Sequence, residues 1–215
     1  ANPTGAMIRQ ADLSKILDYC KKHGILLVLD ECFVEFLDEE RSCGCIREFL
    51  DWETGRPEHG GSLFLLRAFT KTYAMAGLRL GYLMTGDLSV LHAVAQQLPE
   101  WNVSSIAQRA GISALQDTEY EKRTRQLIEK ERRYLIQEFL KMGCTVFPSE
   151  ADYITFRLPQ EKTGFLLKER LLEGKILIRS CANYRNMPPD CYRIAVKQHA
   201  DNEELVRQVW RILIQ

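Results

Sequence analysis

One lysine and one arginine stand close together in a segment that contains two glycines. Lys71 follows the apolar run 63–66, and Arg79 comes shortly after it, between Gly77 and Gly81. A lysine amine placed in a cleft can form a Schiff base with a carbonyl compound. An arginine guanidinium binds phosphate oxygens in pairs, and glycines let the backbone approach a ligand closely. Taken alone, the segment is equally compatible with an ordinary strand that ends in a solvated lysine.

Two further motifs suit a carbonyl cofactor that carries a phosphate, namely pyridoxal 5′-phosphate (PLP). Asp30 ends the apolar run 27–29, which predicts a buried strand with a carboxylate at its C-terminal end, where α/β sheets bind ligands. That carboxylate can pair with a protonated pyridine nitrogen, although a lone aspartate is more often a helix cap or a surface acid. The sequence Asn-Pro-Thr-Gly at 2–5 supplies the amide of Asn2, which can donate to a phenolate oxygen. The order of these motifs favours the cofactor.

With these motifs the chain resembles the aspartate aminotransferase-like (fold type I) PLP enzymes, in the branch of histidinol-phosphate aminotransferases and threonine-phosphate decarboxylases. The resemblance covers essentially the whole chain. It implies an α/β, PLP-dependent transferase-like fold that comprises the C-terminal part of a large domain and a small α+β domain. The implied domains are 1–117, the second half of the PLP-binding large domain, and 118–215, a linking helix with the small domain.

The resemblance also assigns roles to particular residues. Lys71 is implied to be the catalytic residue that forms the Schiff base, and Asp30 to be the partner of the pyridine nitrogen. Asn2 is implied to contact the ring oxygen of PLP. Arg79, helped by Thr70, is implied to anchor the cofactor phosphate.

Two arginines near the C-terminus are the candidate substrate-binding residues. Arg179 ends the apolar run 176–178, and Arg193 lies between Tyr192 and Ile194, so each is predicted to lie on a strand. A guanidinium binds carboxylate or phosphate oxygens bidentately. The resemblance assigns the substrate α-carboxylate to Arg193 and the substrate phosphate to Arg179. The alternative is a pair of exposed strand arginines without a ligand.

Three local features favour a decarboxylase over an aminotransferase. Thr70 precedes the lysine where aminotransferases of this branch more often carry serine. Phe33, a predicted cofactor-binding residue, stands where they usually carry tyrosine, and the stretches 99–103 and 176–184 resemble threonine-phosphate decarboxylases. We therefore expect PLP-dependent decarboxylation of L-threonine O-3-phosphate to aminopropanol phosphate, as in cobalamin biosynthesis. An aminotransferase of the histidinol-phosphate type and an inactive fragment are the alternatives.

Composition bounds the partners and the compartment. The chain has 29 basic and 29 acidic residues, so we expect neither nucleic acid nor a membrane surface as a partner. Seven cysteines without a disulfide framework indicate a reducing compartment, and no apolar stretch reaches the roughly 20 residues of a membrane span, so we expect a cytoplasmic protein. Cys43 and Cys45 lack a second pair or a nearby histidine, and we predict no metal site.

Relatives of this branch are considerably longer and carry Asn-Pro-Thr-Gly in their middle. We therefore expect this chain of 215 residues to be the C-terminal portion of a longer enzyme, homodimeric when complete and acting on a small phosphorylated amino acid. Alone, the portion should be inactive, with an empty cofactor site. Its uncovered sheet edges should promote self-association, or else its first residues, Asn2 included, should be poorly ordered.

Hydrophobic periodicity predicts the elements that position these residues. The stretch 37–61 is predicted to be a loop with a short helix at 44–50. The other predicted helices are 9–23, 87–97, 104–115, 118–142, 161–173 and 201–214, and the predicted strands lie near 25–30, 63–68, 80–84, 144–147, 152–157, 175–179 and 191–197.

Overall fold

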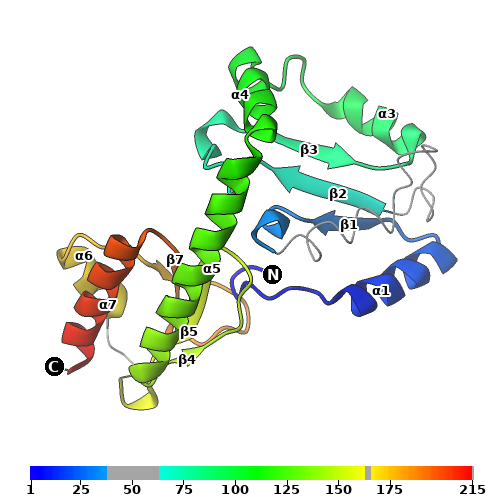
Figure 1. Ribbon diagram of the computed structural model, residues 1–215. Helices are drawn as coiled ribbons and strands as arrows, with labels where there is room; N and C mark the ends of the chain where they lie inside the picture. The colour runs from blue at the N-terminus through cyan, green and yellow to red at the C-terminus, as the bar shows by residue number, and fades with distance from the viewer. Residues whose placement is uncertain (38–62, 163–165, 215) are drawn as a thin grey trace. The chain divides into compact units, whose positions relative to one another are not determined.

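The computed structural model describes residues 1–37, 63–162 and 166–214 (Figure 1). The chain divides into two compact units. The N-terminal unit is Ile8–Arg123, and the C-terminal unit combines Ala1–Met7 with Thr124–Gln215. The sequence placed residues 1–117 together, whereas the first seven residues cluster with the C-terminal part of the chain. The identity of the units as parts of a PLP enzyme's two domains stays a prediction.

A three-stranded mixed sheet forms the centre of the N-terminal unit. Its strands, in spatial order, are β1 (Leu27–Asp30), β2 (Leu63–Ala68) and β3 (Gly81–Met84). Strands β1 and β2 run parallel, so their C-terminal ends meet at one edge of the sheet, whereas β3 runs antiparallel to β2. The helices of this unit are α1 (Gln10–Lys22), α3 (Leu88–Gln97) and α4 (Ser105–Gln116).

Helix α1 packs against one face of this sheet. Leu13 and Leu17 are buried in one cluster with Leu63 and Leu65 of β2. A spacing of four residues places the first pair on one side of the helix, and a spacing of two places the second pair on one face of the strand. Gly24 follows the helix with a φ of 62°, a left-handed conformation that commonly ends helices. The sequence pattern predicts the helix at 9–23 and its end before Gly24, but not its packing against β2.

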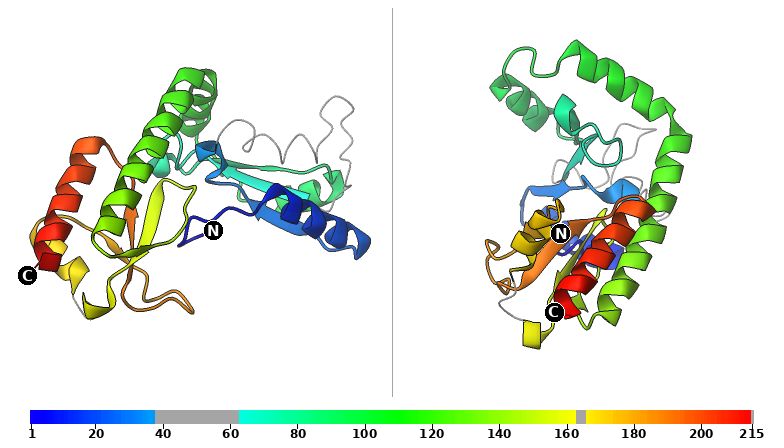
Figure 2. Two further views of the ribbon diagram at one scale, coloured as in Figure 1. Left: turned by 60° about the horizontal axis from the view of Figure 1, so that its bottom comes forward. Right: turned by 90° about the vertical axis from the view of Figure 1, so that its left-hand side faces the viewer.

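A four-stranded antiparallel sheet forms the centre of the C-terminal unit. Its strands, in spatial order, are β4 (Thr145–Val146), β5 (Tyr153–Arg157), β7 (Cys191–Ala195) and β6 (Arg179–Ser180). The C-terminal part of α5 (Thr118–Lys141) lies beside α7 (His199–Ile214), and α6 (Leu167–Glu173) completes the unit (Figures 1 and 2).

The core of the C-terminal unit joins helix α5 to the sheet and to helix α7. The rings of Phe139 and Phe156 are fully buried, with centroids 4.3 Å apart. The buried carboxylate of Glu131 accepts hydrogen bonds from Asn202 Nδ2 at 2.9 Å and from His199 Nδ1 at 3.1 Å. Burial alone would raise the pKa of Glu131, but these hydrogen bonds outweigh it and lower the pKa. The ionised carboxylate therefore ties α5 to the start of α7.

Most of the predicted helices and strands are present with shifted ends. Strand β6 is shorter than its prediction at 175–179, because only Arg179 and Ser180 pair with β7 and Lys175 has a positive φ of 62°. The helix predicted at 161–173 begins at Leu167. The predicted helix at 44–50 and the residues Cys43 and Cys45 lie outside the described residues. In the described part of the chain, no helix combines the length and apolar character needed to cross a membrane.

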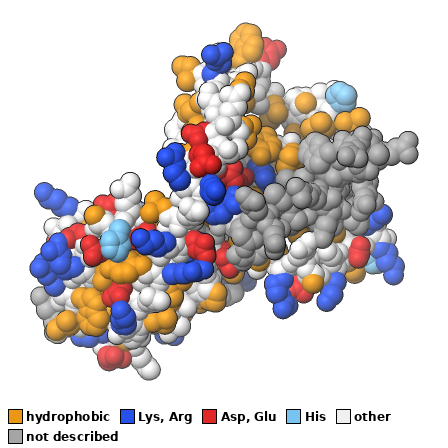
Figure 3. All heavy atoms as spheres, in the orientation of Figure 1, with side chains coloured by type: hydrophobic (Ala, Val, Ile, Leu, Met, Phe, Trp, Pro, Cys, Tyr) orange, Lys and Arg blue, Asp and Glu red, His pale blue; other side chains and the backbone are white. Residues whose placement is uncertain are grey.

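The surface of the C-terminal unit carries charges of both signs. On the face drawn in Figure 3, basic, acidic and hydrophobic side chains are interspersed over this unit. Surface pairs such as Arg133 with Glu129 and Lys141 with Glu138 contribute to this mixing.

Candidate functional site

The C-terminal edge of strands β1 and β2 gathers an amine, a carboxylate and an aromatic ring. Asp30 is the last residue of β1, and Lys71 follows the end of β2. The Lys71 Nζ atom lies 5.4 Å from the centroid of the Phe33 ring. Asp30 Oδ1 accepts a hydrogen bond from the backbone N–H of Cys32 at 3.0 Å. Within the described residues, the exposed Lys71 makes no ion pair, so its amine is available to a ligand.

The charges of Asp30 and Lys71 both affect the pKa of the Cys32 thiol. Burial raises the pKa of Cys32 to about 12, and Asp30 contributes to the rise through a hydrogen bond and its charge, whereas the charge of Lys71 opposes it. The side chains of Asp30 and Lys71 are therefore both near enough to Cys32 to interact with it electrostatically. A thiol with such a pKa is protonated near neutral pH, so Cys32 is a poor nucleophile here.

A buried ion pair holds the turn that follows Asp30. Arg67 of β2 donates to Glu31 Oε2 from Nε at 3.0 Å and from Nη2 at 2.9 Å, and its Nη1 lies 3.6 Å from Glu35 Oε1. The backbone N–H of Glu31 also donates to Leu66 O at 2.9 Å. Burial raises the pKa of Glu35, and Arg67 partly opposes this rise. The sequence analysis did not predict this pairing of Arg67 with Glu31 and Glu35. An acidic residue directly after Asp30 was the feature that could have indicated it.

Arg79 lies in a strained turn between β2 and β3. Its φ is 56°, a left-handed conformation that costs on the order of 1 kcal/mol or more for a residue other than glycine. Arg79 Nη1 donates to Ala76 O at 3.0 Å, and its other N–H groups have no acceptor among the described residues. Thr70 is half-buried in the same turn. Such strain persists only where the surrounding structure holds the backbone in that conformation.

Packing requires glycine at one of the two glycines of this turn. A Cβ on Gly81 would lie 2.8 Å from Arg67 O, so the close pairing of β3 with β2 requires glycine there. The interpretation of Gly81 as a point where a phosphate approaches the backbone stays a prediction, and strand pairing is a second reason for glycine at this position. A Cβ on Gly77 would meet no atom within 4 Å among the described residues, so packing does not require glycine there.

The two candidate substrate arginines face each other in the C-terminal unit. Arg179 of β6 is the cross-strand partner of Arg193 of β7, so both side chains stand on one face of the sheet. Neither guanidinium has a carboxylate partner among the residues that the structure describes. Directly opposed like charges destabilise a sheet by roughly 0.2–1 kcal/mol. An unneutralised pair at this position is suited to an anionic ligand.

Each arginine rests on a tyrosine ring. The Arg193 Cζ atom lies 4.8 Å from the centroid of Tyr153, and the Arg179 Cζ atom lies 5.3 Å from the centroid of Tyr184. Cation–π contacts of this kind hold a guanidinium without occupying its N–H groups. Burial raises the pKa of the neighbouring Cys181 thiol, and both guanidinium charges oppose this rise. Sequence periodicity gave no signal for either ring.

The Asn-Pro-Thr-Gly motif is bound to the C-terminal unit. Tyr153 Oη donates to Ala1 O at 3.0 Å, and the buried Thr155 hydroxyl donates to Pro3 O. Gly5 has a φ of 81°, and its carbonyl accepts from the Glu150 N–H at 2.9 Å. These contacts hold the first residues in place. Poor order of these residues was one of the two alternatives expected from the sequence.

The side chain of Asn2 contacts a substrate-binding candidate. Asn2 Oδ1 accepts hydrogen bonds from Arg193 Nη1 at 2.7 Å and from Tyr184 Oη at 3.0 Å. The sequence did not indicate this link to Arg193. Asn2 Nδ2 has no acceptor in the described part of the chain, so it is free to donate to a ligand. The predicted contact of Asn2 with a cofactor ring oxygen stays a prediction.

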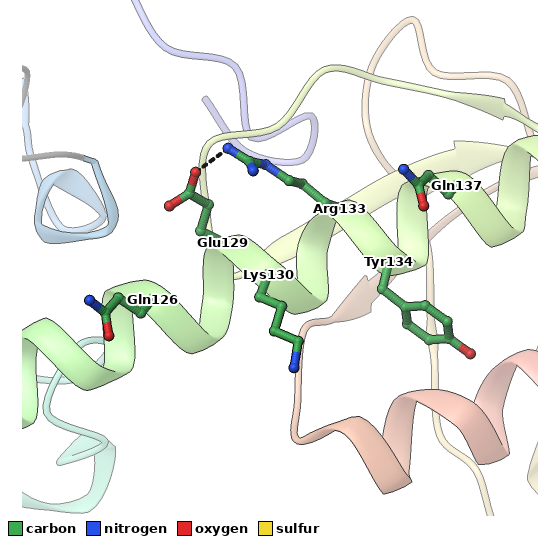
Figure 4. A pocket seen from close by; sticks show the side chains of 6 residues that line it. All are labelled: Gln126, Glu129, Lys130, Arg133, Tyr134 and Gln137. Carbon is green, nitrogen blue, oxygen red and sulfur yellow. Dashed lines mark hydrogen bonds and ion pairs between the residues drawn. The ribbon is translucent and has the colours of Figure 1, made fainter.

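A shallow hollow runs along helix α5, and none of the candidate site groups described above lines it (Figure 4). All its lining side chains come from α5 itself, and one of its basic groups, Arg133, is paired with Glu129. A single helix offers no opposing wall from which functional groups could converge. The lining residues are Gln126, Glu129, Lys130, Arg133, Tyr134 and Gln137.

Comparison with known proteins identifies relatives for this arrangement. The family model for aminotransferase class I and II matches residues 1–209. Threonine-phosphate decarboxylase of Salmonella typhimurium is 35% identical over 213 residues, which are 99% of this chain and 55% of that protein. The chain thus spans about half the length of the curated relatives it matches.

Solved structures of related proteins have the same fold. Histidinol-phosphate aminotransferase from Clostridium acetobutylicum has a TM-score of 0.86 at 29% identity, over 99% of this chain and 61% of that one. Histidinol-phosphate aminotransferase from Sinorhizobium meliloti, solved in complex with pyridoxal 5′-phosphate, has a TM-score of 0.80 at 21% identity, over 99% of this chain and 55% of that one. The predicted α/β aminotransferase-like fold is confirmed.

Proposed function

Because this chain belongs to the aminotransferase class I and II family, we propose that it forms part of a PLP-dependent enzyme that decarboxylates L-threonine O-3-phosphate. The observation that carries the substrate class is the pair Arg179 and Arg193, directly opposite each other and without an acidic partner among the described residues. A phosphorylated amino acid carries two anionic groups, a carboxylate and a phosphate. Two guanidinium groups on neighbouring strands supply one partner for each.

The groups of the N-terminal unit fit the cofactor. Lys71 has an exposed amine without an ion-pair partner in the described residues, and Asp30 supplies a carboxylate at the same sheet edge. Lys71 would hold the aldehyde carbon, Asp30 the pyridine nitrogen, and Arg79 with Thr70 the phosphate. Phe33, whose ring lies near Lys71, would border the ring of the cofactor. When bound, PLP supplies an electron-accepting ring that takes up the electron pair of a bond broken at the amino-acid α-carbon.

The arginines would select which bond breaks. Arg193 would grip the α-carboxylate and Arg179 the phosphate, and together they would fix the rotation of the substrate about its α-carbon. Decarboxylation requires the bond to the carboxylate to stand perpendicular to the cofactor ring, whereas transamination requires the bond to hydrogen there. A misplacement of the reacting groups by about 1 Å can reduce the rate by roughly 100-fold. Small changes in how the two arginines hold the substrate would therefore decide which reaction occurs.

A second candidate is an aminotransferase of the histidinol-phosphate type. The specific observation in its favour is the TM-score of 0.86 with the aminotransferase from Clostridium acetobutylicum. The decarboxylase is the first choice because the identity to threonine-phosphate decarboxylase of Salmonella typhimurium is 35% over almost the whole chain. The local sequence around Thr70 and Phe33 also favours it.

Variants of the two arginines in the complete enzyme test the substrate class. Arg193→Ala should weaken binding of every amino-acid substrate, because losing one partner of a buried charge pair costs roughly 2–5 kcal/mol. Arg179→Ala should raise KM for L-threonine O-3-phosphate far more than for threonine, with Arg185→Ala, at an exposed position between β6 and β7, as the control. Equal losses for both substrates in Arg179→Ala would contradict the phosphate role.

A further inference from the structure

We propose that Tyr184, in the connection between β6 and β7, is a positioning residue for this anion site. Its ring holds the guanidinium of Arg179, and its hydroxyl holds the side-chain amide of Asn2. This inference rests on the proposed function, because it assumes that Arg179 and Arg193 bind the anionic groups of a substrate.

Two turns fix the backbone of Tyr184. Its N–H donates to Cys181 O at 3.0 Å, and its carbonyl accepts from the Met187 N–H at 3.1 Å. The backbone N–H of Cys181 in turn donates to Cys191 O at 2.9 Å, which ties the connection to the start of β7. The half-buried side chain of Tyr184 is therefore directed by backbone hydrogen bonds on both sides.

The ring of Tyr184 holds Arg179 without neutralising it. A carboxylate at this place would occupy the N–H groups of Arg179 and compete with an incoming anion. An aromatic face attracts the cation and leaves those N–H groups available. It also opposes the repulsion between Arg179 and Arg193, which would otherwise drive the two side chains apart.

Arg193 fixes which way the Asn2 amide faces, and the Tyr184 hydroxyl holds the same amide oxygen. Arginine is always a donor, so the Asn2 atom that it contacts at 2.7 Å must be the oxygen. Tyr184 Oη donates to the same oxygen at 3.0 Å, so both of its acceptor positions are used. The Asn2 NH₂ group therefore points away from Arg193 and remains able to donate to the cofactor ring oxygen.

Tyr153 supports Arg193 in a comparable way, but its hydroxyl donates to the backbone of Ala1. Tyr184 instead contacts two side chains, those of Arg179 and Asn2. It thereby connects the group proposed to bind the substrate phosphate to the group proposed to bind the cofactor ring.

Phosphate binding by the chain itself tests this inference, with affinity measured by ³¹P relaxation of inorganic phosphate. Tyr184→Leu should weaken binding roughly two- to fivefold, the size expected for losing a cation–π contact at a partly exposed site. Tyr184→Phe keeps the ring and should bind phosphate as the unsubstituted chain does, while changing the side-chain NH₂ signals of Asn2. Tyr134→Leu, on helix α5, is the control for removing a tyrosine ring from this unit.

The outcomes separate this inference from the proposed function. If Arg179→Ala binds phosphate as tightly as the unsubstituted chain, the phosphate role of Arg179 fails. If Arg179→Ala loses binding but Tyr184→Leu does not, the positioning role of Tyr184 is overturned and the proposed function stands. If Tyr184→Leu does not fold, the NMR spectrum of the ¹⁵N-labelled unsubstituted chain still tests the inference. Its Arg179 Nε–H signal should be shifted by the ring, and an unshifted signal overturns the inference.

Discussion

Lys71 and the two opposed arginines have separate roles in the proposed reaction, so substituting them should impair the enzyme in different ways. Lys71 and Asp30 lie at the same sheet edge of the N-terminal unit, whereas Arg179 and Arg193 share a sheet face of the C-terminal unit. Loss of the amine removes the covalent hold on the cofactor. Loss of a guanidinium removes a grip on the substrate and should leave the cofactor bound.

Replacing Lys71 should abolish turnover in the complete enzyme. In Lys71→Ala no other residue can bond the cofactor aldehyde from this position, so activity should fall to background, whereas Lys15→Ala on the exposed side of α1 should retain it. Borohydride treatment of the unsubstituted enzyme, followed by peptide mapping, should find the pyridoxyl group on Lys71. An adduct on a different lysine would refute this assignment.

At the level of secondary structure, the ion pair of Arg67 and Glu31 joins strand β2 to the turn after β1. Both side chains are largely buried, with 12% and 4% of their surface exposed. Arg67→Ala should destabilise the protein by about 3–5 kcal/mol, since it leaves Glu31 buried without its partner. Chemical denaturation measures this loss.

The surface pair of Arg133 and Glu129 is the matched control for this prediction. Both side chains are largely exposed on α5, so Arg133→Ala should change stability by about 1 kcal/mol or less. Similar losses for Arg67→Ala and Arg133→Ala would show that the buried pair does not hold the turn.

Glu131 should make the link between α5 and α7 sensitive to acid. Its pKa is lowered from the ordinary value of 4.5 in the folded state, so its stabilising effect is present above that value. The effect is lost as the pH falls through the lower pKa of the folded state. Glu131→Gln cannot ionise and should flatten this part of the curve of unfolding free energy against pH. An unchanged curve would rule out Glu131 as the titrating group.

The sequence predicts the elements better than it predicts the contacts between them. Periodicity identifies helices such as α1 and α5 because burial of one face repeats every three to four residues. It also identifies Lys71 and Arg193 as candidates, because each follows or interrupts an apolar strand. It does not reveal that Asn2 meets Arg193, because that contact joins opposite ends of the chain. The ring of Tyr184 was missed because its direction depends on turns rather than on periodicity.

At the scale of the whole molecule, strand β1 is an edge of the described three-stranded sheet. Val28 on this strand is 52% exposed, and an apolar edge strand favours association between chains. We expect the chain of 215 residues to self-associate with increasing concentration in analytical ultracentrifugation. Val28→Lys should reduce this association, because a charged side chain on an edge strand opposes strand pairing. A monomer at every concentration would contradict this expectation.

The product formed from L-threonine O-3-phosphate tests the proposed function most directly. The complete enzyme is incubated with PLP and substrate labelled with ¹³C in the carboxylate, with and without 2-oxoglutarate. A decarboxylase releases the label as carbon dioxide, forms aminopropanol phosphate and does not need 2-oxoglutarate. We predict this result, and we predict its absence in Lys71→Ala. Retention of the label in a keto acid that forms only with 2-oxoglutarate would contradict the decarboxylase and identify an aminotransferase.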